Sequence, residues 1–589
     1  MEFILSNLNR RSSTFESIYR SIRILNCVSN RVLFRVYLNL ILMIFSSLLE
    51  SLSVLSISSF VNQIQSSGNI DESKLINIGF LSNYLSDFNP TKIFILFIFL
   101  TGIIRIFTLW FNCKTSAIIG NEITIKAYST ILNWPYKKHR SINSSDNTAA
   151  LTQFSKAIVG TITNFLIIIH SFLIAITICL TLLNVDLKLS LSLILIISCA
   201  YFINNILMDS FIKKTSNIVK RETLNTFKII KESLEGIKDI ILNDTFNKEI
   251  RNLVKKDFKL KNATVDNKFV AMYPKYLFES IIIIALILFL RSENDYQNNV
   301  EIISQISVFA FGAQKLLPSF QSIYASLISI KHSAKKADGL LEIIDNLDKN
   351  QNIKQLSRNI SINKKTKLFN KSLEIKSISY RHSKNEDYII DNFNLTIKRG
   401  EFIAIMGPSG KGKTTIIDII MGLIIPEKGT IKVDGKYLLK DKVFNNIKDW
   451  RYSIGHVQQN VFLLDTTIKE NIVYGKKISE IDNLNKKLVE VSKIVCLEEL
   501  INSLPNGFDE YIGERGNRLS GGQIQRIGLA RAIFNKNPII ILDEATSALD
   551  SFLEKKILFN IKNYCKDSAL IMITHREKST FICDKVVNI

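Results

Sequence analysis

The sequence predicts two structurally different halves: an all-α transmembrane half with six helices, followed by an α/β half. Two observations predict this division. Residues 1–330 contain six apolar segments, each close to the ~20 residues that a helix needs to cross a bilayer. Residues 371–589 instead contain short apolar runs separated by turn residues, a pattern typical of buried strands alternating with helices. Between them, residues 331–370 are rich in Lys, Asn, Ser and Asp, which predicts a linker.

The composition agrees with a membrane protein that has large charged parts outside the bilayer. Apolar residues make up 47% of the 589 residues, charged residues 22%, and the mean hydropathy is +0.16. A net charge of +22 suggests a nucleic-acid-binding protein as one alternative. However, the charge is dispersed, and no compact aromatic-basic motif accompanies it. We therefore expect a membrane and no nucleic acid among the partners. The seven cysteines have neither close pairs nor metal-binding spacing, so we expect no disulfide and no zinc site.

The N-terminal half begins with residues 1–32, which carry five arginines and no small-residue cleavage site. This pattern predicts an amphipathic cytoplasmic helix and not a signal peptide. Six membrane spans are then predicted, at 36–61, 93–111, 158–183, 189–207, 270–290 and 302–328. An even number of spans places both ends of this half on the same side of the membrane.

The charge of the connections indicates which side that is. Residues 209–262 carry thirteen Lys/Arg against eight Asp/Glu, and residues 114–156 are also basic, whereas 62–92 and 292–301 are shorter and not basic. Because basic connections stay in the cytoplasm, the α/β half is predicted to be cytoplasmic, on a multi-pass protein of the inner (plasma) membrane. The two long basic connections predict helix pairs that extend from the membrane and reverse near 143–146 and 236–244.

The α/β half opens with a phosphate-binding motif in its proper context. An apolar run at 402–406 leads into a glycine-rich loop and then an apolar helix, and the loop reads Gly407-Pro408-Ser409-Gly410-Lys411-Gly412-Lys413-Thr414-Thr415. This is the G-x-x-x-x-G-K-T pattern between a strand and a helix. Its backbone N–H groups can wrap phosphates, Lys413 can reach the β and γ phosphates, and Thr414 can bind Mg²⁺.

Two later strings supply the remaining parts of a nucleotide site. Leu519-Ser520-Gly521-Gly522-Gln523 predicts a turn that opens a helix, where backbone N–H groups can bind a phosphate. Residues 539–544 form an apolar run that ends in two carboxylates, which predicts a buried strand that presents both acids at its end. Asp543 suits Mg²⁺, and Glu544 suits the polarisation of an attacking water.

Together and in this order, the three motifs resemble the Walker A, signature and Walker B motifs of ABC transporters. With six spans ahead of them, the whole chain resembles an exporter-type half-transporter. The resemblance implies a P-loop ABC nucleotide-binding domain over 371–589 that hydrolyses ATP with Mg²⁺ and couples hydrolysis to transport. It also implies that Gln459 senses the γ-phosphate and Mg²⁺, and that His575 is the switch histidine. Ser520–Gln523 of one copy would complete the site of another, so the resemblance implies a homodimer.

One position departs from the family pattern. ABC proteins place an aromatic residue that stacks on adenine where this chain has His382, with Tyr380 two residues earlier. An imidazole can stack, although less extensively than a larger ring, and Tyr380 can instead belong to the core. His382 is therefore our candidate for the adenine contact.

Three cations in or near the spans bear on the cargo: Arg105, Lys275 and Lys315. Charges at such positions are costly and usually face a cavity or a partner, so three of them favour an anionic cargo. The alternative is that Arg105 pairs with Glu50 and that Lys275 reaches the membrane surface.

The segments around these cations, at 101–111, 270–279 and 315–319, resemble those of bacterial lipid-linked oligosaccharide flippases. In that family, basic residues attract a pyrophosphate–sugar headgroup; lysine replaces arginine here at 275 and 315, which keeps the charge but loses the planar fork. An apolar stripe over 70–88 resembles the external helix that engages the polyprenyl tail, although such a stripe can also pack on the spans.

The resemblance thus implies flipping of a polyprenyl-pyrophosphate-linked oligosaccharide or a related anionic, amphipathic glycolipid. A general exporter of drugs, peptides or lipids is the alternative, and the lack of a peptidase-like domain before the first span disfavours a peptide-processing exporter. The spans argue against a nucleic-acid ATPase of this fold. The intact catalytic motifs argue against a channel or a regulatory ABC protein.

Overall fold

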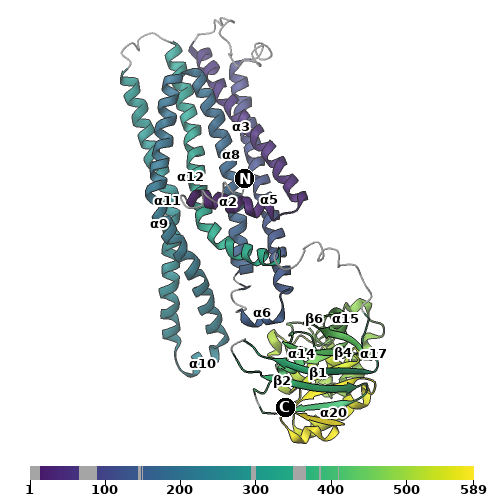
Figure 1. The fold of residues 1–589 in the computed structure, drawn as a ribbon. Coiled ribbons are helices and arrows are strands. Elements are labelled where there is room, and N and C mark those ends of the chain that lie inside the picture. The colour runs from purple at the N-terminus through teal and green to yellow at the C-terminus, as the bar shows by residue number, and fades with distance from the viewer. Residues whose placement is uncertain are drawn as a thin grey trace. The chain divides into compact units, whose positions relative to one another are not determined.

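The computed structural model describes residues 13–65, 89–142, 147–148, 150–292, 300–348, 366–383, 386–408 and 410–589. It divides into a helical unit before residue 359 and an α/β unit from residue 359 onward, with Pro135–Lys137 grouped with the second unit (Figure 1).

Six long helices build the helical unit. They are α3 (Asn30–Gln65), α5 (Pro90–Leu132), α8 (Ser155–Val185), α9 (Leu187–Glu235), α11 (Phe246–Ser292) and α12 (Val300–Asp348). Shorter elements are α2 (Ser13–Asn26), α6 (Tyr136–Ser141), a π-helical turn (Ala150–Phe154) and α10 (Ile237–Leu242). The long helices lie side by side, with α3 against α5, α8 against α12 and α9 against α11 (Figure 1).

Four helices in the described residues are long and apolar enough to cross a membrane. They cover Asn30–Val61, Pro90–Leu132, Leu151–Val185 and Ser190–Glu235. They contain the first three predicted spans and all of the fourth except Leu189. The fifth and sixth predicted spans fall within α11 and α12, and remain predictions. The predicted reversal at 236–244 coincides with α10, whereas the reversal at 143–146 and the apolar stripe over 70–88 lie outside the described residues.

Helix α12 extends into the segment 331–370, which stays the predicted linker. This helix continues to Asp348 and so occupies the first part of the segment 331–370. The physical reason is that Leu340, Leu341 and Ile344 are buried on one side of the helix, in the same apolar cluster as Ile24 of α2. Most residues of the segment 331–348 are polar, so its narrow apolar stripe does not stand out in the sequence.

The helices of this unit pack closely against one another, and their outer faces expose large apolar side chains. A Cβ at Gly120 of α5 would lie 2.3 Å from Val159 Cγ2 of α8, and one at Gly312 of α12 would lie 2.8 Å from Leu182 Cδ2 of α8. Large apolar side chains such as Ile106 and Phe202 remain exposed, at 71% and 65%. Exposed apolar surface on this scale suits contact with lipid.

The α/β unit contains two five-stranded sheets. The antiparallel sheet has the order β2-β1-β4-β5-β6, and the parallel sheet has the order β10-β3-β9-β8-β7. The strands are β1 (Ser372–Tyr380), β2 (Ile390–Lys398), β3 (Phe402–Met406), β4 (Lys428–Val433), β5 (Lys436–Lys440), β6 (Val443–Phe444), β7 (Ile454–Val457), β8 (Ile539–Asp543), β9 (Ala569–Ile573) and β10 (Lys585–Asn588). The helices are α14 (Lys413–Ile420), α15 (Ile447–Tyr452), α16 (Ile468–Ile472), α17 (Leu484–Ile494), α18 (Glu498–Ser503), α19 (Gly521–Ile533) and α20 (Ser551–Tyr564).

Alternate residues of β3, β8 and β9 enter two different apolar cores. Phe402, Leu542 and Met572 belong to one cluster, whereas Ile405 and Ile541 belong to the other. Both faces of the parallel sheet are therefore covered, which explains why these strands are continuous apolar runs in the sequence. Because the three strands are parallel, their carboxyl ends meet at one edge of the sheet. The phosphate loop, the acid pair and His575 follow directly from those ends.

Candidate active site

The loop between β3 and α14 has a backbone conformation that requires glycine. Gly407 has a φ of +155° and Gly412 a φ of +86°. A Cβ at Gly407 would lie 2.8 Å from the Ile589 carbonyl oxygen, and one at Gly412 would lie 2.8 Å from Ile389 Cγ2. The loop can thus turn its backbone toward a ligand because these positions carry no side chain. Ser409 lies outside the described residues.

Lys413 is buried against this loop. Its Nζ donates hydrogen bonds to the carbonyl oxygens of Gly407, at 2.7 Å, and Pro408, at 2.8 Å. Burial lowers the pKa of Lys413, and the carboxylates of Glu544 and Asp543 act in the opposite direction. Of the two following threonines, Thr414 is exposed and can bind a metal, whereas Thr415 is buried in the packing of α14.

Asp543 ends β8 with 7% of its surface exposed. Burial, followed by the nearby carboxylates of Glu544 and Asp418, raises the pKa of Asp543 to about 6, although Lys413 partly offsets this. A divalent cation would relieve this crowding of acids, so the chemistry of these residues fits Mg²⁺, and Asp543, Thr414 and Gln459 stay its predicted protein oxygen ligands. When bound, Mg²⁺ would neutralise charge on phosphate oxygens.

Glu544 is where the three predicted catalytic residues meet. Gln459 Nε2 donates a hydrogen bond to Glu544 Oε2 at 2.6 Å, and His575 Nε2 lies 2.8 Å from Oε1. The backbone of Glu544 has a φ of +48°, and its N–H donates to the Ile573 carbonyl at 3.2 Å. A strained backbone is typical of a functional position. Here the side chain is also held by two contacts, from Gln459 and His575. This arrangement suits a group that orients and polarises a water molecule.

The signature segment forms the start of α19. Ser520 Oγ accepts a hydrogen bond from the Gln523 N–H at 3.3 Å, and Gln523 Oε1 accepts one from the Ser520 N–H at 2.8 Å. This capping box fixes the helix N-terminus, whose partial positive charge favours a phosphate. Within the described part of the chain, no hydrogen bond joins Ser520 or Gln523 to the phosphate loop.

Two residues that the sequence analysis missed hold the turn after Glu544. Gln525 of α19 donates to Ser547 Oγ and accepts from the Ala548 N–H, both at 2.9 Å. Arg576, next to His575, donates to the carbonyl oxygens of Ser547, at 2.8 Å, and Leu549, at 3.4 Å. The turn therefore connects the signature helix to the switch segment. No local sequence pattern could have shown this, because the contacts join distant parts of the chain.

The adenine candidate stays a prediction. His382 is exposed, and its Nδ1 lies 3.3 Å from the hydroxyl of Tyr380. The two rings are perpendicular with centroids 5.4 Å apart. Tyr380 is buried in an apolar cluster, which confirms that it belongs to the core.

Two of the three predicted cargo cations converge on one acid. Lys315 Nζ lies 2.8 Å from Glu50 Oε1, and Arg105 NH1 lies 3.6 Å from the same oxygen. The alternative pairing of Arg105 with Glu50 is thus confirmed, and the participation of Lys315 was missed. Lys275 is exposed on α11 with Nζ 5.8 Å from the centre of the Tyr276 ring, and among the described residues no ion pair joins it to Glu50.

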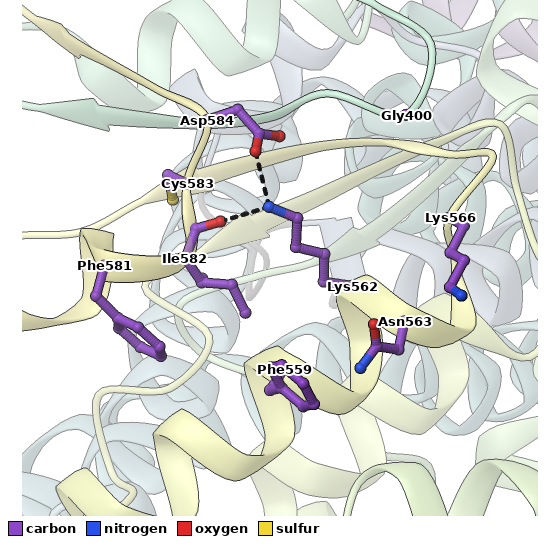
Figure 2. A pocket seen from close by; sticks show the side chains of 9 residues that line it. All are labelled: Gly400, Phe559, Lys562, Asn563, Lys566, Phe581, Ile582, Cys583 and Asp584. Atoms are coloured by element: carbon purple, nitrogen blue, oxygen red, sulfur yellow. Dashed lines mark hydrogen bonds and ion pairs between the residues drawn. The ribbon is translucent and has the colours of Figure 1, made fainter.

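A separate pocket of about 640 Å³ lies at the other edge of the parallel sheet (Figure 2). It is lined by Gly400, which precedes β3, by the C-terminal half of α20 and by residues 581–584, which precede β10. Lys562 Nζ donates hydrogen bonds to Asp584 Oδ1 and to the Ile582 carbonyl oxygen, both at 2.8 Å. Figure 2 shows both as dashed lines. Because it lies at the start of the strands, this pocket is not part of the phosphate site.

Comparisons with known proteins match this chain to ABC transporters and to export proteins. A family model described as ABC transporter matches residues 390–547. A putative export ATP-binding/permease protein of Rickettsia typhi is 28% identical over 526 residues, which cover 87% of each chain. A putative multidrug export ATP-binding/permease protein of Staphylococcus aureus (strain NCTC 8325) is 38% identical over 220 residues, which cover 36% of each chain.

The fold is also that of a solved exporter. The structure of a bacterial Atm1-family ABC exporter with ATP bound matches with a TM-score of 0.72 at 19% identity, over 95% of this chain and 94% of the other. The phosphate loop, the acid pair and the signature helix all fall in the α/β unit, where the family model matches. The chain therefore carries an ABC transporter ATPase domain behind a helical membrane domain, and as a whole it has the fold of an ABC exporter.

Proposed function

We propose that this ABC ATPase drives the flipping of a polyprenyl-pyrophosphate-linked oligosaccharide, or a related anionic glycolipid, across the inner membrane. The observation that supports an anionic cargo is the group formed by Glu50, Arg105 and Lys315, in which two cations face one carboxylate. The cations keep exposed surface, 50% of the side chain for Arg105 and 24% for Lys315. With two cations and one carboxylate, this group has a net positive charge, which favours an anionic headgroup in an apolar helical unit.

The form of the protein that we propose hydrolyses ATP is a homodimer. Each chain has one phosphate loop and one signature segment, so two copies would form two complete sites, with Lys413, Thr414, Asp543 and Glu544 of one copy facing Ser520–Gln523 of the other. In each site Lys413 and Mg²⁺ would bind the phosphates, and Glu544 would polarise the water that attacks the γ-phosphate. In this proposal His382 contacts adenine, and closure of the dimer moves the membrane helices.

Reconstitution in vesicles tests this function. The purified protein should show ATPase stimulation by a polyprenyl-pyrophosphate glycan and ATP-dependent movement of a labelled copy of that lipid between leaflets. The corresponding uncharged polyprenol serves as the control ligand. Stimulation by neutral hydrophobic drugs instead, with Arg105 and Lys315 both dispensable, would favour a general exporter and contradict the proposal.

A further inference from the structure

The pocket of about 640 Å³ in the α/β unit lies at the start of the parallel strands, away from the phosphate loop (Figure 2). Pockets of about 300–1,000 Å³ are typical of sites that hold small organic ligands. The walls come from three segments: the turn before β3, the C-terminal half of α20 and the loop 581–584. Its size therefore suits a small molecule, and its lining indicates the chemical class of that molecule.

The walls of the pocket are held in place by contacts within the protein. Asp584 Oδ1 accepts a hydrogen bond from Lys562 Nζ, and Asp584 Oδ2 accepts one from the Phe402 N–H, both at 2.8 Å. A Cβ at Gly400 would lie 2.9 Å from the Lys566 carbonyl oxygen, so the turn before β3 packs directly on the end of α20. Because these contacts need no ligand, little free energy is lost in ordering the walls when a ligand binds.

Two phenylalanines that line the pocket keep much of their surface exposed. Phe559 of α20 is 58% exposed and Phe581 is 55% exposed, and Figure 2 shows both beside the pocket. Apolar surface in water is unfavourable, and a planar ring placed against these side chains would cover it. Aromatic rings also gain from offset-stacked or edge-to-face contacts with one another. The lining therefore favours a flat aromatic ligand.

Lysines without a counter-charge lie beside these rings. Lys566 lines the pocket, and no hydrogen bond or ion pair joins its Nζ to another described residue. Lys555 Nζ lies 5.5 Å from the centre of the Phe581 ring. The acids nearby in the sequence are already paired, Asp584 with a third lysine and Asp567 with an arginine. The charge of the pocket therefore complements an anion.

We propose that this pocket is a binding site for a small, planar aromatic acid, with its ring against Phe559 and Phe581 and its carboxylate at Lys566. The exposed amide of Asn563, which also lines the pocket, can donate a hydrogen bond to the same carboxylate. The phosphate loop follows the opposite ends of the strands, so ATP and this ligand occupy different sites. The site is independent of the cargo, and its failure would leave the proposed function in place.

Three compounds of similar size separate the two parts of this recognition. 2-Naphthoate is planar and anionic, 2-naphthamide is planar and neutral, and decahydro-2-naphthoate is anionic without an aromatic ring. Full-length protein in nanodiscs is dialysed against each compound with an excess of a non-hydrolysable ATP analogue, which fills the phosphate site. Empty nanodiscs measure the uptake by lipid. We expect 2-naphthoate to bind at least about fivefold more tightly than either analogue.

Each part of the recognition has a variant and a matched control. Phe559→Ser should weaken binding of 2-naphthoate about tenfold, whereas Phe552→Ser, at another exposed phenylalanine of α20, should not. Lys566→Gln should reduce the preference for 2-naphthoate over 2-naphthamide to less than about twofold. Lys556→Gln, at an exposed lysine of α20 that does not line the pocket, should keep the preference. All four side chains are exposed, so each variant should hydrolyse ATP at the wild-type rate.

The remaining outcomes overturn the proposal. Uptake of 2-naphthoate no greater than that of empty nanodiscs removes the site, and so does equal weakening in Phe559→Ser and Phe552→Ser. Equal affinity for 2-naphthoate and 2-naphthamide, or an equal loss of preference in Lys566→Gln and Lys556→Gln, contradicts recognition of the anion. Equal affinity for decahydro-2-naphthoate contradicts recognition of the ring. Binding that occurs only without the ATP analogue would place the compound in the phosphate site instead.

Discussion

Glu544 combines a strained backbone with two side-chain contacts, from Gln459 and His575. All three residues follow the carboxyl ends of neighbouring parallel strands, β7, β8 and β9. The meeting of Glu544 and His575 could be predicted from the sequence, because each follows directly on an apolar run and parallel strands end at one edge. The position of Gln459 could not, because β7 (Ile454–Val457) contains Gly455 and His456 and is not an apolar run.

Replacing Glu544 by Gln should lower ATP hydrolysis by about a hundredfold or more, while ATP still binds. The amide keeps the size of the side chain but cannot polarise water as a carboxylate does. Phosphate release and binding of a labelled ATP analogue measure the two effects separately. Glu577→Gln, at an exposed acid two residues beyond His575, is the control. Near-normal turnover of Glu544→Gln would remove Glu544 from the catalytic role.

Other residue contacts were beyond the reach of the sequence. Glu50 and Lys315 are 265 positions apart, and Gln525 and Ser547 are 22 apart. No periodic pattern connects such residues, because their contact depends on how whole helices and loops pack. In the sequence, Lys315 is therefore a separate cation, and neither Gln525 nor Arg576 is part of a recognisable pattern.

At the scale of elements, Arg576 joins the switch segment to the turn after Glu544. Its guanidinium bonds two carbonyl oxygens of that turn and lies 3.3 Å from Glu554 of α20, which is 4% exposed. The fork shape of the guanidinium allows these contacts at the same time.

Arg576→Ala should therefore loosen this turn and lower kcat about tenfold, with a smaller effect on the KM for ATP. Arg576→Lys should recover only part of the rate, because an ammonium group cannot make the same set of bonds. Steady-state ATPase kinetics of the full-length protein measure both constants. Full activity of Arg576→Ala would refute the role of Arg576 in holding this turn, and full recovery in Arg576→Lys would refute the need for its fork shape.

The β4–β5 hairpin supplies a stability prediction. Its two-residue turn, Asp434-Gly435, has positive φ angles of +51° and +80°, as a tight hairpin turn requires. The Asp434 carboxylate accepts backbone hydrogen bonds from Asn370 at 2.8 Å, Lys371 at 2.7 Å and Ser372 at 3.1 Å. Burial acts to raise the pKa of Asp434, but these bonds outweigh it and hold the pKa below its ordinary value of 3.8.

Asp434→Asn should lower the free energy of unfolding by about 2 kcal/mol at pH 7. Because the pKa is depressed in the folded state, the stabilisation is present above pH 3.8 and is lost as the pH falls through the lower folded-state value. The difference between wild type and variant should thus shrink below pH 4, as measured by denaturant unfolding. Asp567→Asn, at a side chain that is 91% exposed, should change little at any pH. A pH-independent difference would contradict the assignment.

The elements themselves were predictable to different degrees. Long apolar segments predict membrane helices, and short apolar runs predict buried strands. The first four spans and the strands β3 and β8 were therefore foreseen. The end of α12 was not foreseen, because its sequence is mostly polar. Among the side chains that the structure describes there, Leu340, Leu341 and Ile344 are the buried apolar ones that hold it in the core.

At the scale of the whole molecule, the division of the ATP site between two copies is the most consequential expectation. The signature helix is fixed by its own capping box, and it contacts the turn after Glu544 through Gln525. A change at one site can therefore reach the segment that would complete the other site.

Mixing two inactive chains tests this division. Lys413→Ala disables the phosphate loop and Ser520→Arg blocks the signature segment, so each variant alone should lack hydrolysis. A heterodimer of the two has one site with both defects and one site with none, and it should recover up to about half of the wild-type rate. A chain with both substitutions, paired with a wild-type chain, has one defect in each site and should be inactive. ATPase rates of heterodimers isolated with two different tags distinguish these cases. Activity in the second heterodimer but not in the first would show that each chain closes its own site.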